Sequence, residues 1–276
     1  MGRIKTEPLD TFTDLDIAAL SVAGRKRAKE SNQDSLRVLP ADPRRGLPVL
    51  LILADGMGGY AGGAVASQLL VETVELHYKE AEIPLDLPAL LNDCLQAALQ
   101  AMKQHSEDHP EHASMGSTVV IAAVENEKVT LVNVGDSRAY HLHGSEMDLV
   151  SYDHSVVADM VRSKEITPLQ ARSHPKRNRL TQSISPKRKT FTPYVTQFHF
   201  SEDDILVLCT DGLWGVVPEA LLQAISQELS PGEAVKKLIS FANQNGGPDN
   251  ISVIIARRKG ITMEKPYNED ETNPGV

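Results

Sequence analysis

The sequence predicts an α+β domain whose sheets are mostly antiparallel. Short apolar runs rich in Val, Ile and Leu recur along the chain, and amphipathic helical stretches stand in pairs between groups of these runs. A chain that forms a parallel sheet would instead alternate strand and helix. The 276 residues, 41% of them hydrophobic, suffice for a sizeable core. No internal linker or fixed repeat divides the chain, so we expect one domain over 14–260, with loose ends at 1–13 and 261–276.

Ten strands are expected along the chain. The runs are short and rich in β-branched side chains, which favours strands over helices. Asn126-Glu127 and His143-Gly144-Ser145 stand between neighbouring runs and are typical of hairpin turns. The predicted strands cover 17–23, 35–39, 47–54, 117–125, 128–134, 137–143, 147–151, 194–200, 205–210 and 251–257.

Two pairs of helices are expected between the groups of strands. In the helix expected at Pro88–Met102, apolar side chains recur at three- and four-residue spacing, which gives the helix one apolar face. Both helices of the later pair open on a proline, which the first helical turn tolerates. The first pair covers Ala61–Tyr78 and Pro88–Met102, and the second pair covers Pro218–Gln227 and Pro231–Asn243.

The segment 156–190 is expected to hold a short helix, a second helix near 166–172 and then a basic stretch. Thr167 is a typical N-cap, and Pro168 suits the first turn that follows it. The basic stretch is either a solvated surface loop or a device that steers an anionic substrate, such as a phosphorylated segment, toward a site. Between positions 171 and 190 the chain has no acidic residue and carries Arg172, Lys176, Arg177, Arg179, Lys187, Arg188 and Lys189.

Four aspartates stand where a predicted strand meets a sharp turn. Asp55, Asp136 and Asp211 follow apolar runs, and Asp249 precedes one. Carboxylates at strand ends are held rigidly and face an open edge, which suits hard cations such as Mg²⁺ or Mn²⁺. A neighbouring glycine such as Gly56 permits a close backbone approach, so that a carbonyl can also reach the cation. A single Asp-Gly pair marks an ordinary turn, but four acids at strand ends indicate a metal site.

Composition excludes several classes of function. The net charge of −9 argues against nonspecific nucleic-acid binding. Cys94 and Cys209 give neither a disulfide framework nor zinc spacing, and no secretory signal is present, so we expect a cytoplasmic protein. No apolar run is long enough to span a bilayer, and no membrane association is expected.

Seven short motifs, in order, carry a family resemblance. Together they resemble the metal-dependent PP2C (PPM) Ser/Thr protein phosphatases in their bacterial-type form, over about residues 17–257. The motifs are Ser31-Asn32-Gln33-Asp34, Ala54-Asp55-Gly56-Met57-Gly58-Gly59, Gly116-Ser117-Thr118, Val134-Gly135-Asp136-Ser137-Arg138-Ala139, Tyr152-Asp153-His154-Ser155, Cys209-Thr210-Asp211-Gly212-Leu213-Trp214 and Gly247-Pro248-Asp249-Asn250.

The resemblance implies a β-sandwich of two mostly antiparallel sheets, flanked by helices on both faces, with the segment 156–190 as a flap. It also implies a core of two Mn²⁺ or Mg²⁺ ions with a third, weaker one. Asp55 would bridge the two core ions, Gly56 would offer its carbonyl, and Asp211 and Asp249 would complete the second ion.

The remaining implied roles concern Asp34 and Asp136. Asp34 would act directly or through a metal-bound water, and Asp136 would hold the third ion together with Asp211. Asp34, Asp55 and Asp211 are thus the expected catalytic residues, in a reaction where a water that bridges the metals attacks phosphoserine or phosphothreonine directly. The substrates would be proteins phosphorylated by a Ser/Thr kinase. The enzyme is expected to be a monomer.

Three positions depart from the family pattern. Lys29 stands where the family usually has arginine, and a point charge binds phosphate less well than a guanidinium fork. Arg27 could compensate if its segment is extended. Tyr60 replaces a histidine and is a poorer acid near neutral pH, unless it only packs. Ala64 replaces a frequent glutamate of unassigned role.

These departures leave alternatives open. A binding or regulatory module that kept the fold and lost turnover is the main one, and a two-metal nuclease or phosphodiesterase is another, supported only by the basic stretch. His154 is either a catalytic base or a structural residue beside a helix cap, with Asp153 or Ser155 supplying the cap oxygen.

Overall fold

The computed structural model describes residues 14–81 and 86–259 and shows two β-sheets packed face to face. Every strand pair in these residues is antiparallel. The first sheet has the order β1-β11-β10-β7-β8. Its strands are β1 (Leu15–Val22), β11 (Ile251–Arg258), β10 (Ile205–Cys209), β7 (Arg138–His143) and β8 (Glu146–Leu149).

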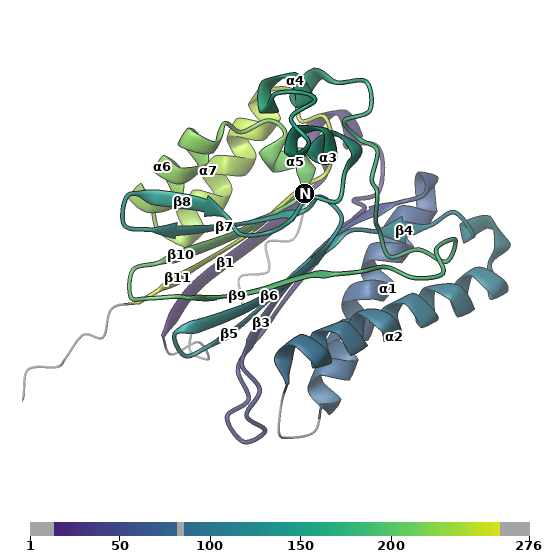
Figure 1. Cartoon of the computed structure of the whole chain (residues 1–276), viewed down its shortest axis with the longest axis horizontal. Helices are drawn as coiled ribbons and strands as arrows, with labels where there is room; N and C mark the ends of the chain where they lie inside the picture. Colours follow the sequence, from purple (N-terminus) through teal and green to yellow (C-terminus); the bar gives the residue numbers. More distant parts are fainter. Residues whose placement is uncertain (1–13, 82–85, 260–276) are drawn as a thin grey trace, which may run out of the picture.

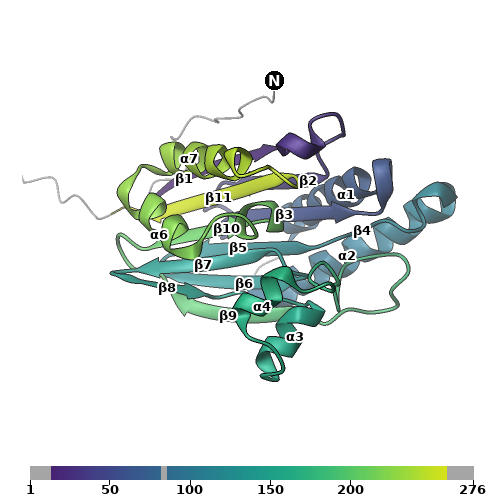
Figure 2. The ribbon, with the colours of Figure 1, turned by 90° about the horizontal axis from the view of Figure 1, so that it is seen from above.

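The second sheet has the order β2-β3-β5-β6-β9, and the short strand β4 pairs with the end of β3. Its strands are β2 (Asp34–Leu39), β3 (Val49–Met57), β4 (Gly116–Ser117), β5 (Val119–Glu125), β6 (Lys128–Val134) and β9 (Tyr194–His199). Figure 1 shows the two sheets stacked, with helices outside each of them, and Figure 2 shows α6 and α7 lying over the strands when the molecule is seen from above.

Helices cover both outer faces. The pair α1 and α2 lies on the second sheet, and α6 and α7 lie on the first (Figure 1). The helices are α1 (Gly59–Glu80), α2 (Leu87–Asp108), α3 (Val156–Arg162), α4 (Pro168–Ser173), α5 (Asp211–Trp214), α6 (Glu219–Glu228) and α7 (Pro231–Gln244), with short 3₁₀ turns η2 at Arg25–Arg27 and η3 at Pro110–His112. The expected sandwich with helices on both faces is confirmed.

Strand β3 shows why the central strands are continuously apolar. Leu50 and Ile52 pack under α1 and α2, whereas Leu51 and Leu53 face the other sheet. Side chains alternate along a strand, so a strand covered on both faces needs apolar residues at every position. Burial of both faces stabilises the layered structure and leaves its strand ends to carry polar groups.

Several local predictions are confirmed. Asn126 and Gly144 have positive φ values of 47° and 55° in two-residue turns, which suits the twist of a hairpin. Ser155 caps α3 by accepting a hydrogen bond from the Ala158 N–H, so the structural interpretation of its motif is confirmed. Thr167 and Gln170 form a capping box at α4.

Other boundaries differ from the prediction. The expected strand 117–125 is divided into β4 and β5, and the helix expected at 88–102 continues to Asp108. The segment holding Arg27 is a 3₁₀ turn rather than extended chain. None of the helices in the described residues combines the length and apolar character needed to cross a membrane. The tails expected at 1–13 and 261–276 lie outside the described residues.

Candidate active site

The predicted acidic residues meet at one end of the sandwich. Asp55 near the end of β3 pairs in register with Asp34 at the start of β2. Asp211 opens α5, two residues beyond Cys209, where β10 ends, and Asp249 precedes β11 in the same sheet as β10, which is the other sheet. Asp136 lies in the turn between β6 and β7, where the chain crosses from one sheet to the other. Both sheets therefore contribute carboxylates to a single site.

A cavity of about 670 Å³ opens at this end of the molecule. Four of the five predicted carboxylates line it, together with Gly56, and Asp34 lies buried behind them. Three arginines also line the cavity, namely Arg27, Arg179 and Arg188. A cavity lined by both carboxylates and arginines is expected for a site that binds metal cations and also an anionic substrate.

Burial and mutual repulsion make these carboxyl groups poor anions in the absence of a cation. Burial is the largest cause in each case: it raises the pKa of Asp34 to about 7 and that of Asp211 to about 6. The pKa values of Asp55 and Asp136 are raised well above the usual range by burial and then by neighbouring aspartates. Such a cluster is stabilised when positive charge enters it.

Asp34 provides a second sign that a cation belongs here. Its Oδ2 atom accepts hydrogen bonds from the hydroxyls of Thr210 and Ser252 at 3.0 and 2.7 Å. Its Oδ1 atom is buried and has no hydrogen-bond partner among the described residues. A buried oxygen without a partner costs free energy, so the Oδ1 atom fits a site completed by a cation or by its water.

The kind of cation follows from the donors. In the described residues, no three His, Cys, Asp or Glu side chains are grouped closely enough to form a ligand set by themselves. The described side chains that line the cavity include carboxylates but none of the cysteines or histidines that structural zinc sites use. Mg²⁺ and Mn²⁺ accept carboxylate and carbonyl oxygens and keep several waters, so the donors present fit these ions.

Two glycines allow the loops of the site to approach each other. A Cβ atom on Gly56 would lie 2.0 Å from the Gly63 carbonyl oxygen, and one on Gly212 would lie 1.9 Å from the Asn250 carbonyl oxygen. A side chain at either position would push neighbouring backbone away. The Asp-Gly pairs therefore do more than turn the chain, because they set the spacing of the acids.

The structure separates the two cations expected to bind phosphate. Arg27 lines the cavity, with its Nε atom 3.2 Å from Asp249 Oδ1 and its Nη1 atom 2.7 Å from Glu30. Lys29 is exposed and is not among the residues that line the cavity. Ala64 lies on α1, and the side chain of Tyr60 is outside the described part of the structure.

Sequence reasoning missed several residues that support the site. Trp214 Nε1 donates to the Asp136 carbonyl at 3.0 Å, and the Arg138 guanidinium lies 3.8 Å from the centre of the Trp214 ring. Arg138 also forms an ion pair with Asp153. The Asp-Ser-Arg and Leu-Trp sequences were the available signal, but only the fold shows that they meet.

His154 is placed as a structural residue. It is buried, its Nδ1 atom accepts a hydrogen bond from the Gly135 N–H at 3.2 Å, and it is not among the residues that line the cavity. Burial lowers its pKa. Its contact instead fixes the turn that carries Asp136.

Comparison with known proteins identifies the family. The family model described as protein phosphatase 2C matches residues 23–250. The chain belongs to the protein phosphatase 2C family. Membership makes it an enzyme, a protein phosphatase, and speaks against the nuclease or phosphodiesterase alternative.

Two relatives illustrate how close the match is. The serine/threonine phosphatase Stp of Listeria innocua is 32% identical over 239 residues, which cover 85% of this chain and 93% of the relative. The serine/threonine protein phosphatase PstP of Mycobacterium tuberculosis is 34% identical over 207 residues, covering 75% of this chain and 40% of the relative.

Solved structures of protein phosphatase 2C relatives agree with the fold. The crystal structure of M. tuberculosis PstP has a TM-score of 0.80 at 32% identity, covering 90% of this chain and 100% of that one. A PstP catalytic domain in complex with two manganese ions has a TM-score of 0.78 at 30% identity, covering 90% and 99%.

Proposed function

We propose that this protein hydrolyses phosphoserine and phosphothreonine in phosphoproteins by direct attack of water, without a covalent phosphoenzyme. The observation that carries the proposal is the meeting of carboxylates from both sheets at one cavity, where burial raises the pKa values of four of them. Two bound Mn²⁺ or Mg²⁺ ions would lower the pKa of a water between them and offset charge on the phosphoryl oxygens.

Different aspartates would bind different ions. We assign Asp55, the Gly56 carbonyl, Asp211 and Asp249 to the core pair, which is supported by their common position on the cavity wall. Asp136 also lines this wall and is assigned to a third, weaker site.

Asp34 would orient the nucleophile from behind the ligands. Two hydroxyl donors fix its Oδ2 atom, which limits the orientation of the carboxylate and leaves the buried Oδ1 atom available for a further contact. A carboxylate held in this way can accept a hydrogen bond from an attacking water. Asp34, Asp55 and Asp211 remain the proposed catalytic residues.

Arg27 is the proposed phosphate-binding residue. Glu30 and Asp249 hold its guanidinium at the rim of the cavity, and an arginine has further N–H donors for phosphate oxygens. Lys29, exposed on the same loop, would at most attract the substrate at longer range. The replacement of the usual arginine by Lys29 is then compensated by Arg27.

The cellular setting is also proposed. We expect substrates phosphorylated by a Ser/Thr kinase and a monomeric enzyme. A cytoplasmic location is supported by Cys94 and Cys209, which are both free and buried.

The proposal is tested by Mn²⁺-dependent hydrolysis of a phosphothreonine peptide. Asp211→Asn should lower kcat/KM by about a hundredfold, because it removes a charge that would hold a cation. Asp203→Asn, the same substitution at an exposed position on the opposite end of β10, should leave it unchanged. If the unmodified protein shows no hydrolysis and Asp211→Asn behaves identically, the proposed reaction is wrong. A phosphodiester should not be cleaved.

A further inference from the structure

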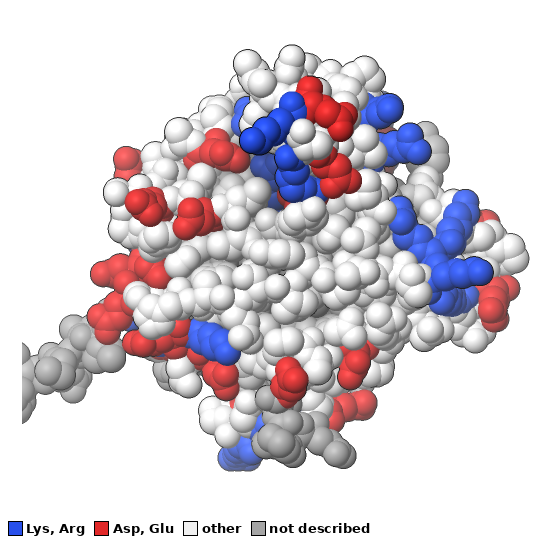
Figure 3. All heavy atoms as spheres, in the orientation of Figure 1, with Lys and Arg blue, Asp and Glu red and all other residues white. Residues whose placement is uncertain are grey.

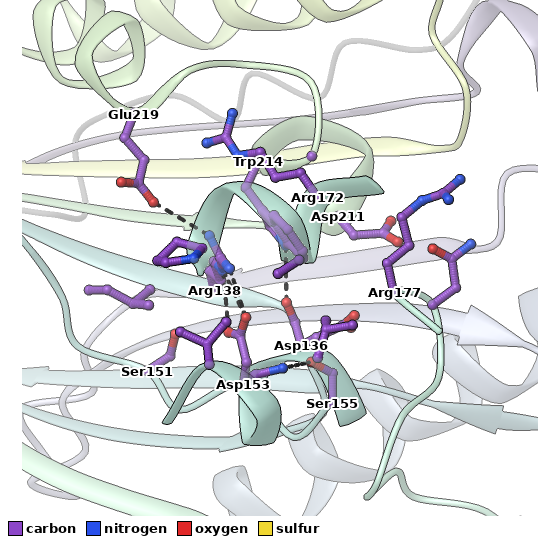
Figure 4. Close-up of a pocket in the computed structure, with 18 of the residues that line it drawn as sticks. Asp136, Arg138, Ser151, Asp153, Ser155, Arg172, Arg177, Asp211, Trp214 and Glu219 are labelled. Carbon is purple, nitrogen blue, oxygen red and sulfur yellow. Dashed lines mark hydrogen bonds and ion pairs between the residues drawn. The ribbon is translucent and has the colours of Figure 1, made fainter. Parts of the chain in front are cut away.

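A second cavity of about 450 Å³ adjoins the catalytic one. It lies between the flap helices α3 and α4 and the segment from α5 to the start of α6 (Figure 4). Apolar side chains line the cavity from both sides, among them Val161 of α3 and Trp214 of α5, and Leu149 of β8 adds a third. The volume accommodates more than one amino-acid side chain, so the cavity is larger than phosphate binding alone requires.

The two cavities are continuous in their lining. Asp136, Asn178, Asp211 and Asp249 line both of them. Residues two positions apart in an extended peptide are separated by about 7 Å. A phosphoresidue in the catalytic cavity would therefore place its near neighbours in the second one.

Most charged groups of the second cavity are already paired. Arg138 contacts Asp153 at 2.8 Å and Glu219 at 3.5 Å. Arg162 contacts Asp159 and lies over the Tyr152 ring. These groups have little capacity left for a ligand.

Arg172 and Arg177 differ from the other cations. Both line the second cavity and are exposed, and within the described residues neither guanidinium has a hydrogen-bond or ion-pair partner. Figure 4 draws both side chains in the pocket without a dashed line. The acids Asp136, Asp211 and Asp249 on the shared wall are the proposed cation ligands, so the flap side of this cavity is where an anion finds unpaired positive charge.

The basic stretch thus divides into three parts. Arg179 and Arg188 line the catalytic cavity, Arg172 and Arg177 line the second one, and Lys176, Lys187 and Lys189 line neither. In Figure 3, basic side chains on the visible face gather near the top, over α3 and α4, and at the right. Long-range attraction depends on the total charge of the stretch and not on which side chains line a cavity. Direct binding of a substrate side chain requires particular arginines in the cavity.

We propose that the second cavity binds the substrate segment beside the phosphoresidue and selects a further negatively charged side chain there through Arg172 and Arg177. The inference rests on the proposed phosphatase activity. The shared chemistry is an anionic side chain within about two or three residues of the phosphoresidue, from either a carboxylate or a second phosphate. An arginine binds either group, and a phosphate offers more oxygens to a guanidinium fork than a carboxylate does.

The test compares phosphothreonine peptides that differ only in flanking residues: alanine, glutamate, or a non-hydrolysable phosphonate analogue of phosphoserine. The unmodified enzyme should show a kcat/KM about fivefold higher for the glutamate peptide than for the alanine peptide, and higher again for the phosphonate peptide. Arg172→Gln combined with Arg177→Gln should abolish this preference and leave the alanine peptide within about twofold.

The matched control is Lys187→Gln combined with Lys189→Gln, which removes the same charge from the same stretch at exposed positions outside both cavities. It should retain the preference. The proposal is overturned if the unmodified enzyme shows no preference, or if both double variants lose it equally, since that indicates long-range attraction. If no peptide is hydrolysed, the proposed function fails, and anisotropy of the same labelled peptides still decides whether Arg172 and Arg177 select anions.

Discussion

At the residue scale, the hydroxyls of Thr210 and Ser252 determine how Asp34 is presented. Both donate to Oδ2, and all three groups are buried. A hydrogen bond to a charged group in such surroundings contributes about 1.5–3 kcal/mol. The orientation of a proposed catalytic carboxylate therefore depends on two side chains that are neither acids nor metal ligands.

Thr210→Val tests this dependence. The substitution keeps the shape and removes both the donor to Asp34 and the acceptor of the Ser252 N–H, so we expect a loss of about 1–3 kcal/mol in unfolding free energy and weaker Mn²⁺ binding. Denaturant unfolding and titration calorimetry measure the two quantities. Thr130→Val is the matched control, because Thr130 is a buried strand threonine whose partner is Gln197. It should cost less stability, at most about 1.5 kcal/mol, and leave Mn²⁺ affinity unchanged, and equal affinity losses in both variants would contradict the prediction.

At this scale the sequence was informative about acids and less so about cations. Asp55 and Asp211 follow apolar strands, so their position was predictable from the strands alone. Which of Arg27 and Lys29 lines the cavity was not predictable, because it depends on a 3₁₀ turn of three residues. Such a turn has no hydrophobic period by which a sequence could reveal it.

At the scale of elements, the short helix α5 links the catalytic strand β10 to the loop before β11. Gly212, in its first turn, lies against the Asn250 carbonyl, which directly follows Asp249. Two acids from different strands are thereby brought close by a backbone contact. The helix escaped prediction because four residues cannot display a 3.6-residue period. The last six residues of α2 escaped it because they are polar and continue no apolar face.

Gly212→Ala should therefore disrupt the site through the backbone. The added methyl group would lie 1.9 Å from a carbonyl oxygen, so the loop must move, and we expect a loss of more than about 2 kcal/mol in stability together with loss of Mn²⁺ binding. Gly232→Ala provides the control, since nothing lies within 4 Å of the added atom in the first turn of α7. It should be neutral or stabilising by up to about 1 kcal/mol. Thermal unfolding distinguishes them, and a neutral Gly212→Ala would be contrary to the proposed contact.

At the scale of the whole molecule, the site is assembled from both sheets, and the acids repel one another until a cation is bound. The sandwich and the end at which the acids meet could be anticipated from the order of motifs. The second cavity could not be anticipated, because it arises where 168–178 lies against α5 and the start of α6. Contacts between segments so distant in sequence leave no local pattern.

The raised pKa values predict how the metal-free protein responds to pH. An unfolded aspartate has a pKa of about 3.9, whereas that of Asp211 is about 6 and that of Asp34 about 7 in the folded state. Between these values the folded state binds more protons, so its stability falls as pH rises from about 4 to 7. With a chelator present, Tm should decrease from pH 5 to pH 8. Mn²⁺ should raise Tm, and more so at pH 8.

Asp211→Asn should flatten the pH dependence, and Asp203→Asn should not. If Asp211→Asn keeps the slope of the unmodified protein, the carboxylate cluster is not its source. The comparison between variants also removes the contribution of the overall net charge of −9.

The pairing of Asp34 with Asp55 across β2 and β3 has one more consequence. A slip of one residue between these strands would turn every side chain of β2 to the opposite face, and with them the oxygen that Thr210 and Ser252 hold. Four of the six residues of β2 are only half-buried, so packing resists such a slip less in this edge strand than in β3. Catalysis, in contrast, would require the register between β2 and β3 to be correct to the single residue. The specific activity of this enzyme would therefore report the fraction of molecules with the correct register. A compact molecule with a shifted register would be inactive.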